Sequence, residues 1–155
     1  DIQLAILGTG DWVYESYLDE MAGRWPGKFS FTKGFLPELS HRFYAGADLF
    51  LMPSKSEPCG LAQMVALRYG TIPVVRKTGG LSDTITDCGD GMGNGFTFQS
   101  FNAHDMAAAL YRAAELYRVQ PDKWKALVQR AMECDNSWKH SAGEYIKLYK
   151  SLLLK

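Results

Sequence analysis

The sequence predicts an α/β fold, a mostly parallel, Rossmann-like sheet with helices on both faces. Short apolar runs alternate with segments of helical periodicity, and short loops rich in glycine or proline separate them. Strands that alternate with helices pair in parallel, because each helix returns the chain across the sheet before the next strand begins. A length of 155 residues is enough for a sizeable core, and we expect a single domain.

The first half of the chain contains two strands and two helices. Residues 2–7 are a short apolar run ended by the glycine turn 8–11, which is typical of a buried strand. Residues 12–24 place apolar side chains at helical spacing. The alternation in residues 28–35 predicts the second strand. A short helix follows over 37–45, since its proline fits a first turn.

The second half continues the alternation. The apolar run 47–52 predicts a third strand, and residues 60–69 predict a helix stopped by Gly70 at a C-cap position. A fourth strand follows at 72–75, with its proline near the start. The remaining expected elements are a glycine-rich stretch, a short strand at 95–99, and a helical region from residue 102 onward with breaks near 120–121 and 136–137.

The composition excludes several classes of function. Seventeen basic residues balance seventeen acidic ones, so we expect neither a nucleic-acid nor an anionic-membrane surface, both of which need a basic field. No apolar stretch approaches the roughly 20 residues that span a bilayer, and none has the layout of a signal peptide. Cys59, Cys88 and Cys134 lack metal-ligand spacing, and we expect reduced thiols in a cytosolic or plastid-like compartment. We expect no metal, and the family resemblance described below implies no cofactor.

Four loops are candidates for a binding site. In parallel α/β sheets, ligands bind where the carboxyl ends of strands meet the starts of helices. These places are residues 8–11, 33–37, 53–60 and 76–81.

The loop after the third strand carries the strongest signal, PSKSEPCGL. Backbone N–H groups of Cys59, Gly60 and Leu61 would lie unpaired in a first helical turn, which attracts phosphate or polarised hydroxyls. Beside them, Glu57 could accept hydrogen bonds from sugar hydroxyls or stabilise positive charge on a substrate carbon. It could equally be a solvated surface carboxylate. Cys59 has no histidine nearby in sequence to activate it as a nucleophile, and we expect it to be a small buried packing residue.

The glycine loops are less specific. GTGD at 8–11 lacks the third glycine of the dinucleotide fingerprint, because position 13 is valine, and no P-loop motif occurs. GTGD is either a phosphate approach or a tight turn, and KTGGL at 77–81 is either a close approach to a ligand or a hairpin-like turn. His41 and Arg42 could offer a cation at the same edge or lie on a solvated helix face.

The order of motifs resembles the glycogen and starch synthases, the glycosyltransferases that use ADP-glucose. The chain carries, in order, GTGD, SHR, AGAD, PSxxEPCGL, YGxxPVVRxTGGLxDT, NGF and SW…Y…LY. The resemblance implies the C-terminal half of a two-domain GT-B enzyme, lacking its first strand-helix unit. Residues 1–155 would form one partial nucleotide-sugar-binding domain, and 137–155 a helix that packs toward an N-terminal domain absent from this chain.

The resemblance also implies roles for single residues. Glu57 would contact the glucosyl group near the reacting carbon, and the backbone of Cys59, Gly60 and Leu61 would hold glucose hydroxyls and the diphosphate. An aromatic at the position of Phe35 would lie against the adenine. The other implied donor-binding residues are Gly8, Gly10, Asp11, Thr78, Gly79 and Gly80. Lys77 corresponds to a C-terminal look-alike of the family's N-terminal lysine motif and does not inherit that lysine's role.

The reaction implied is retaining transfer of glucose from ADP-glucose to the non-reducing end of an α-1,4-glucan. The partners implied are ADP-glucose, ADP and a glucan acceptor held by the N-terminal domain, and the compartment is the bacterial cytoplasm or a plastid. We expect this chain alone to be inactive. Ser56 and Ala62 depart from the family pattern, and Ala62 lacks a hydroxyl near the phosphates. Two alternatives stay open, a non-catalytic nucleotide or glucan binding module and an enzyme of the same fold that uses UDP-glucose.

Overall fold

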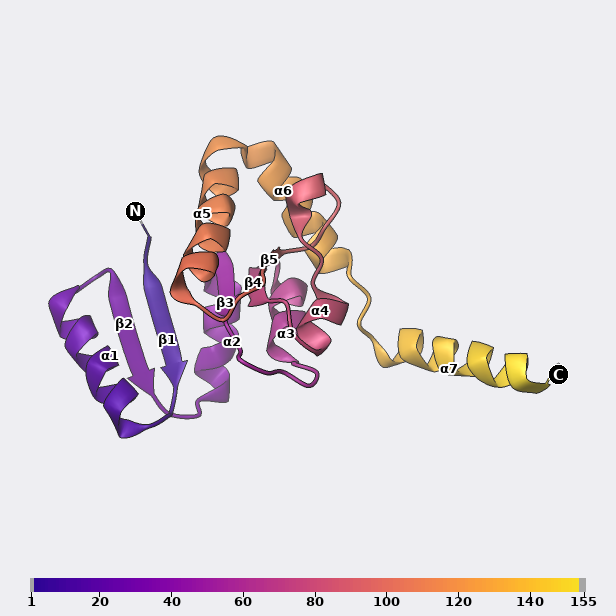
Figure 1. Ribbon diagram of the computed structural model, residues 1–155, viewed down its shortest axis with the longest axis horizontal. Helices are drawn as coiled ribbons and strands as arrows, with labels where there is room; N and C mark the ends of the chain where they lie inside the picture. The colour runs from indigo at the N-terminus through magenta and orange to yellow at the C-terminus, as the bar shows by residue number, and fades with distance from the viewer. Residues whose placement is uncertain (1, 154–155) are drawn as a thin grey trace. The chain divides into compact units, whose positions relative to one another are not determined.

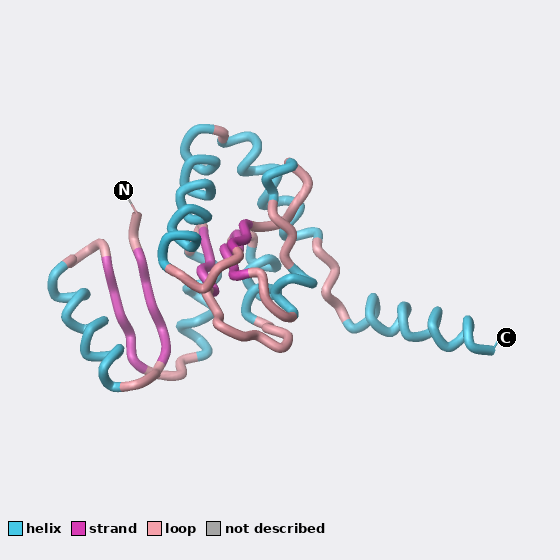
Figure 2. Tube along the Cα trace, viewed as in Figure 1, coloured by secondary structure: helices cyan, strands magenta, loops and turns pink. Residues whose placement is uncertain are grey.

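The computed structural model describes residues 2–153 (Figure 1). It divides into two compact units, Asp1–Gly46 and Ala47–Lys155, which are considered separately below. Figure 2 shows the alternation of strands and helices along both units. This arrangement of parallel strands with helices between them confirms the predicted fold class.

The first unit is a β-α-β-α segment. Strand β1 (Leu4–Gly8) pairs in parallel with β2 (Phe29–Lys33), and helix α1 (Trp12–Arg24) connects them. Helix α1 begins after Asp11, whose Oδ1 accepts a hydrogen bond of 3.0 Å from the backbone N–H of Val13. Helix α2 (Pro37–Gly46) begins at its proline, as predicted.

None of the described residues of this first unit is buried. Its strands carry apolar side chains such as Ile6 and Phe31, which remain partly exposed. A two-stranded sheet with one covering helix has too little area to enclose them. The first unit therefore contributes no core of its own.

The second unit contains a three-stranded parallel sheet in the order β3-β4-β5. Helices lie on both sides of this sheet, with α5 on one side and α3 on the other (Figure 1). Its elements are β3 (Leu49–Met52), α3 (Ala62–Tyr69), β4 (Ile72–Arg76), α4 (Gly80–Thr84), the 3₁₀ helix η1 (Cys88–Asp90), β5 (Phe96–Phe98), α5 (Ala103–Val119), α6 (Pro121–Glu133) and α7 (Trp138–Leu153).

The core of the second unit is built around β4. This central strand is apolar on both faces, and its first four residues are all buried, as expected for a parallel strand between two helical layers. Leu67 of α3, Leu81 of α4 and Leu127 of α6 are buried in the same cluster. Burying a leucine side chain fully contributes about 1.5–3 kcal/mol, so this cluster fixes where the carboxyl end of β4 lies.

Two parts of this unit differ from expectation. Helix α3 begins at Ala62 rather than at residue 60, because Gly60 has φ +75°, a left-handed conformation that cannot start a helix. No helix was expected after β4, where the structure has α4, nor in the glycine-rich stretch, which contains η1. Short helices of this kind have no periodicity that a sequence pattern could reveal.

Helix α7 has no buried residue. Its exposed apolar side chains are Trp138, Tyr145, Ile146, Leu148, Tyr149, Leu152 and Leu153. No helix among residues 2–153 is long and apolar enough to cross a membrane.

Candidate functional site

The loop that carries Glu57 runs from the end of β3 to the start of α3, at the carboxyl edge of the three-stranded sheet. Glu57 is half-buried, and its Oε2 lies 3.4 Å from the hydroxyl of Ser54. Prolines at 53 and 58 restrict the backbone on both sides. The carboxylate is therefore held on a stiff loop at the edge where α/β proteins bind ligands.

Arg76 fixes this loop from the neighbouring strand. It is the last residue of β4, and its Nη1 donates to the carbonyl oxygens of Lys55 at 2.7 Å and Ser54 at 3.4 Å. Its Nε donates to the carbonyl of Gln99 at 3.1 Å. The guanidinium of Arg76 thus joins the Glu57 loop to the segment after β5. The sequence did not predict this connection.

The glycine pair after β4 packs directly on the Glu57 loop. The N–H of Gly80 donates to the carbonyl oxygen of Glu57 at 3.1 Å. A Cβ at Gly79 would clash with the same oxygen, and a Cβ at Gly80 would clash with the carbonyl of Cys59. The glycine pair at 79–80 therefore approaches the backbone of the 53–60 loop closely. The structure brings together Glu57, Cys59, Gly60, Leu61, Thr78, Gly79 and Gly80.

Unpaired backbone donors lie in the same loop. The N–H groups of Gly60 and Leu61 donate to no group within residues 2–153. Leu61 precedes the first residue of α3, so both donors lie at the positive end of that helix. A partly buried carboxylate at Glu57 and these donors thus place opposite electrical signs a few residues apart.

Gln63 lies beneath these donors and was missed by sequence analysis. Its side chain is fully buried, and its Nε2 donates to the carbonyls of Gly60 at 2.8 Å and Cys59 at 3.2 Å, and to Oγ1 of Thr84 at 3.1 Å. The one available signal was a polar residue on the buried side of an apolar helix.

The prediction that Cys59 is buried was wrong. Its side chain is exposed, and its Sγ lies 3.6 Å from the carbonyl oxygen of the adjacent Gly60. The close packing at this position involves the backbone of Cys59, against Gly80, and leaves the side chain outside.

The remaining predicted residues belong to the first unit. Gly8 ends β1, and its carbonyl accepts from the N–H of Gly34 at 3.2 Å, so the 8–11 and 33–35 loops share one edge of the two-stranded sheet. The N–H of Gly10 donates to Oε1 of Glu15 at 2.9 Å, while the carboxylate of Asp11 caps α1. Both groups therefore have hydrogen-bond partners within the first unit.

Phe35 is 91% exposed, as expected of an aromatic surface available for stacking. His41 and Arg42 are exposed on α2, which follows the same edge.

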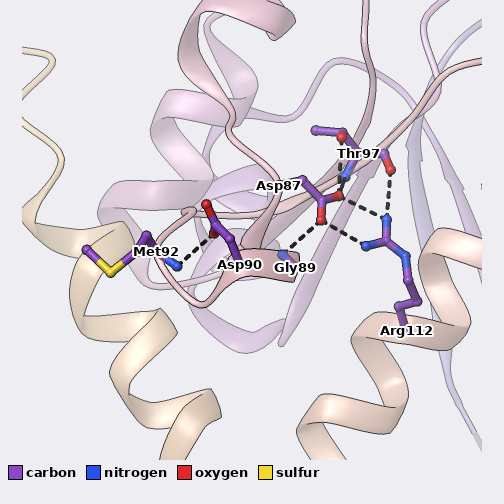
Figure 3. A network of polar contacts seen from close by, with 6 residues as sticks. All are labelled: Asp87, Gly89, Asp90, Met92, Thr97 and Arg112. Carbon is purple, nitrogen blue, oxygen red and sulfur yellow. Dashed lines mark hydrogen bonds and ion pairs between the residues drawn. The ribbon is translucent and has the colours of Figure 1, made fainter.

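An ion pair next to the glycine-rich stretch holds β5 and α5 together (Figure 3). Both carboxylate oxygens of Asp87 accept from Arg112, at 2.8 and 2.9 Å. Asp87 also accepts from the N–H groups of Thr97 at 2.7 Å and Gly89 at 3.0 Å. Partial burial by itself raises the pKa of Asp87, but these hydrogen bonds and the guanidinium charge outweigh it and lower the pKa to about 2.

The same ion pair affects the thiol beside it. Burial, and then the negative charge of Asp87, raise the pKa of Cys88 to about 11. Within residues 2–153, no three His, Cys, Asp or Glu side chains gather closely enough to hold a metal ion.

Parallel sheets flanked by helices, with the polar loops at the carboxyl ends of the strands, define the Rossmann-like half of a GT-B glycosyltransferase. The chain belongs to the family of glycosyl transferases group 1, whose model matches residues 1–133. Helix α7 lies beyond the matched residues.

Curated relatives confirm the resemblance to glycogen synthases. The chain is 54% identical over 157 residues to the glycogen synthase of Geobacillus thermodenitrificans, an alignment that covers 100% of the chain and 32% of the relative. It is 51% identical over 154 residues to the glycogen synthase of Desulfitobacterium hafniense, covering 98% of the chain and 33% of the relative. The chain therefore spans about a third of the length of the curated relatives it matches.

Solved structures agree on the fold. The catalytic domain of starch synthase IV from Arabidopsis thaliana, bound to ADP and acarbose, superposes with a TM-score of 0.85 at 36% identity, over 99% of this chain and 33% of that one. Sucrose-phosphate synthase from Thermosynechococcus elongatus gives a TM-score of 0.69 at 22% identity, over 98% of this chain and 39% of that one, and shows the fold alone.

Proposed function

We propose that this chain is the donor-binding part of a retaining glucosyltransferase that moves glucose from ADP-glucose to the non-reducing end of an α-1,4-glucan. The observation that carries the proposal is the adjacency of the Glu57 carboxylate and the unpaired N–H groups of Gly60 and Leu61 on one stiff loop. Identity of 54% to a glycogen synthase over the whole chain supports it.

The charges of this loop suit the reaction. Glucosyl transfer passes through a transition state in which the sugar carbon gains positive charge while the diphosphate leaves as an anion. In our proposal, Glu57 stabilises the sugar cation, and the N–H groups at the start of α3 receive the phosphate or glucose hydroxyls. Their separation by a few residues allows one loop to serve both charges without a metal ion.

The family resemblance adds further donor-binding residues to the proposal. Gly8, Gly10 and Asp11 line the donor side, and Phe35 offers an exposed ring to the adenine. Thr78, Gly79 and Gly80 form the segment after β4, whose two glycines pack on the backbone of the Glu57 loop. His41 and Arg42 are candidate cations at the edge of the first unit. The ADP bound to the starch synthase IV relative supports an adenine nucleotide as the donor base.

The glucan acceptor and the exposed face of α7 both call for a binding surface outside residues 1–155. We propose that a further domain of the longer protein binds the glucan, and that the exposed apolar face of α7 packs against it. The relatives are about three times as long as this chain, and acarbose bound to starch synthase IV supports an oligosaccharide acceptor. By the same reasoning, we propose that the 155-residue chain alone transfers no glucose.

The test is glucose transfer from ADP-glucose to glycogen by the complete protein. Glu57→Gln keeps the size of the side chain and removes its charge, so we expect turnover to fall about 10²–10³-fold, the usual loss for one preorganised electrostatic group. The matched control is Glu115→Gln, because Glu115 is an exposed carboxylate on α5. Undiminished turnover by Glu57→Gln would contradict the role of Glu57.

Two alternatives have distinct outcomes. A binding module would bind nucleotide or glucan with equal affinity in both variants, and the complete protein would show no turnover. An enzyme that uses UDP-glucose would transfer from that donor faster than from ADP-glucose, since an exposed ring at Phe35 can stack on either base.

A further inference from the structure

The amide of Gln63 connects the two loops at the carboxyl edge of the three-stranded sheet. Its Nε2 donates to the carbonyls of Cys59 and Gly60 in the Glu57 loop and to the hydroxyl of Thr84 at the end of α4. Thr84 in turn donates to the carbonyl of Gly80 at 2.8 Å. Gly80 returns a bond from its N–H to the carbonyl of Glu57. The bonds form a closed circuit between α4 and the loop.

The peptide geometry links this circuit to the unpaired donors. No peptide bond in residues 2–153 is cis, so each carbonyl points opposite to the N–H of the next residue. Because the carbonyls of Cys59 and Gly60 both point at Gln63, the N–H groups of Gly60 and Leu61 must point away from it. Both belong to the loop N–H groups that donate to no group within residues 2–153.

The oxygen of the Gln63 amide differs from its nitrogen in hydrogen bonding. Its Oε1 is buried and has no hydrogen-bond partner among residues 2–153, which is costly for a protein interior. A Cβ at Gly60 would clash with this oxygen, so the loop backbone lies directly on the amide. The contacts that the amide makes are therefore those of its N–H donors.

We propose that Gln63 is a positioning residue that turns the N–H groups of Gly60 and Leu61 outward toward the departing diphosphate. This inference rests on the proposed function for the identity of the ligand, whereas the positioning itself does not depend on it. Gln63 touches no substrate in this proposal and acts through the loop backbone.

The experiment compares the complete wild-type protein with Gln63→Met, which keeps the length of the side chain and removes both N–H donors. The first readout needs no ligand. We expect hydrogen exchange at the amide of Gly80 to accelerate about tenfold, as after the loss of one net hydrogen bond. Exchange at Val75 in β4 should not change. Unchanged exchange at Gly80 would overturn the positioning role.

The second readout is binding. We expect the Kd for ADP and the KM for ADP-glucose to rise about tenfold, because two aligned donors are lost, with a smaller fall in kcat. Leu67→Val is the control, since Leu67 is buried in the same helix as part of the apolar core cluster. It should lower thermal stability and leave the Kd unchanged. An equal rise in Kd for both variants would show a structural role only.

The two proposals fail in different ways. A wild-type protein that neither binds ADP nor transfers glucose contradicts the proposed function, and Gly80 exchange still decides the role of Gln63. A wild-type protein that does both, with Gln63→Met unchanged in Kd, contradicts the positioning role alone.

Discussion

The backbone N–H of Gly80 donates to the carbonyl oxygen of Glu57 at 3.1 Å, so two loops that are separate in sequence meet through main-chain atoms. Neither Gly80 nor the preceding Gly79 has room for a side chain at this contact. The position of Glu57, the proposed catalytic group, therefore depends on the main chain of Gly80. Changes at this contact should therefore alter both stability and turnover.

Gly80→Ala tests the contact without a change of backbone preference. Gly80 begins α4 with an ordinary φ, so the only new feature is a Cβ against the carbonyl of Cys59. We expect the free energy of unfolding to fall by about 1–3 kcal/mol, the usual cost of overpacking. Thermal or urea unfolding of the chain measures it.

Gly143→Ala is the matched control. Gly143 lies within α7 and has no atom within 4 Å of an added Cβ, so alanine should be neutral or slightly stabilising there. Equal effects of both substitutions would mean that the loops do not meet as described.

The Asp87–Arg112 pair makes stability depend on pH in the acid range. Hydrogen bonds and the guanidinium lower the pKa of Asp87 from 3.8 to about 2. A carboxylate with a lowered pKa in the folded state stabilises the fold above its unfolded value, and this contribution is lost as the pH falls from about 4 toward 2. Allowing for solvent screening of a partly exposed pair, we expect about 1–2 kcal/mol.

Asp87→Asn isolates this contribution. The variant should unfold more easily than wild type at neutral pH, and the difference should shrink between about pH 4 and 2. Glu115→Gln, at an exposed site on α5, provides the comparison. Urea unfolding at each pH measures the difference in unfolding free energy between Asp87→Asn and wild type. If that difference stayed constant from about pH 4 to about pH 2, the lost stability would come from packing alone.

Arg76→Lys tests the strand-to-loop connection. Lysine keeps the charge but cannot reproduce bonds from Nη1 to Lys55 and from Nε to Gln99. We expect a loss of about 1–3 kcal/mol in unfolding free energy, and faster proteolysis within the 53–61 loop.

The control for Arg76→Lys is Arg68→Lys, because Arg68 is an exposed arginine on α3 whose side chain forms no hydrogen bond within residues 2–153. A loop equally resistant to protease in both variants would show that Arg76 does not hold it.

Leu148→Ala tests whether α7 has a partner in the longer protein. The side chain is 53% exposed here, so the change should cost less than about 0.5 kcal/mol in this chain. In the complete protein, packing of α7 on a further domain should raise the cost above about 1 kcal/mol. Unfolding measured on both proteins decides the matter, and equal small costs would contradict the proposed packing.

The elements were predictable where apolar runs and turn residues agree. The strand at 72–75, the C-cap at Gly70 and the proline starts of α2 and α6 follow from rules that act over a few residues. Helix α4 was not predictable, because its start depends on the contact of Gly80 with Glu57.

The candidate site divides in the same way. The sequence pointed to Glu57 and Gly60, which stand in a distinctive motif at the end of a strand. Gln63 and Arg76 act through long-range bonds, and no local pattern reports which carbonyl a buried amide or a guanidinium will meet. The exposure of Cys59 was likewise hidden, since it follows from how the loop backbone packs on Gly80.

The three thiols differ enough in accessibility to be told apart by alkylation. Cys59 is exposed next to Glu57, whereas Cys88 and Cys134 are half-buried, and the raised pKa of Cys88 keeps it protonated near neutral pH. A brief treatment with a maleimide dye should therefore label Cys59 before the other two cysteines. The native chain thus provides its own attachment point for a fluorescent reporter at the candidate site, without an engineered cysteine.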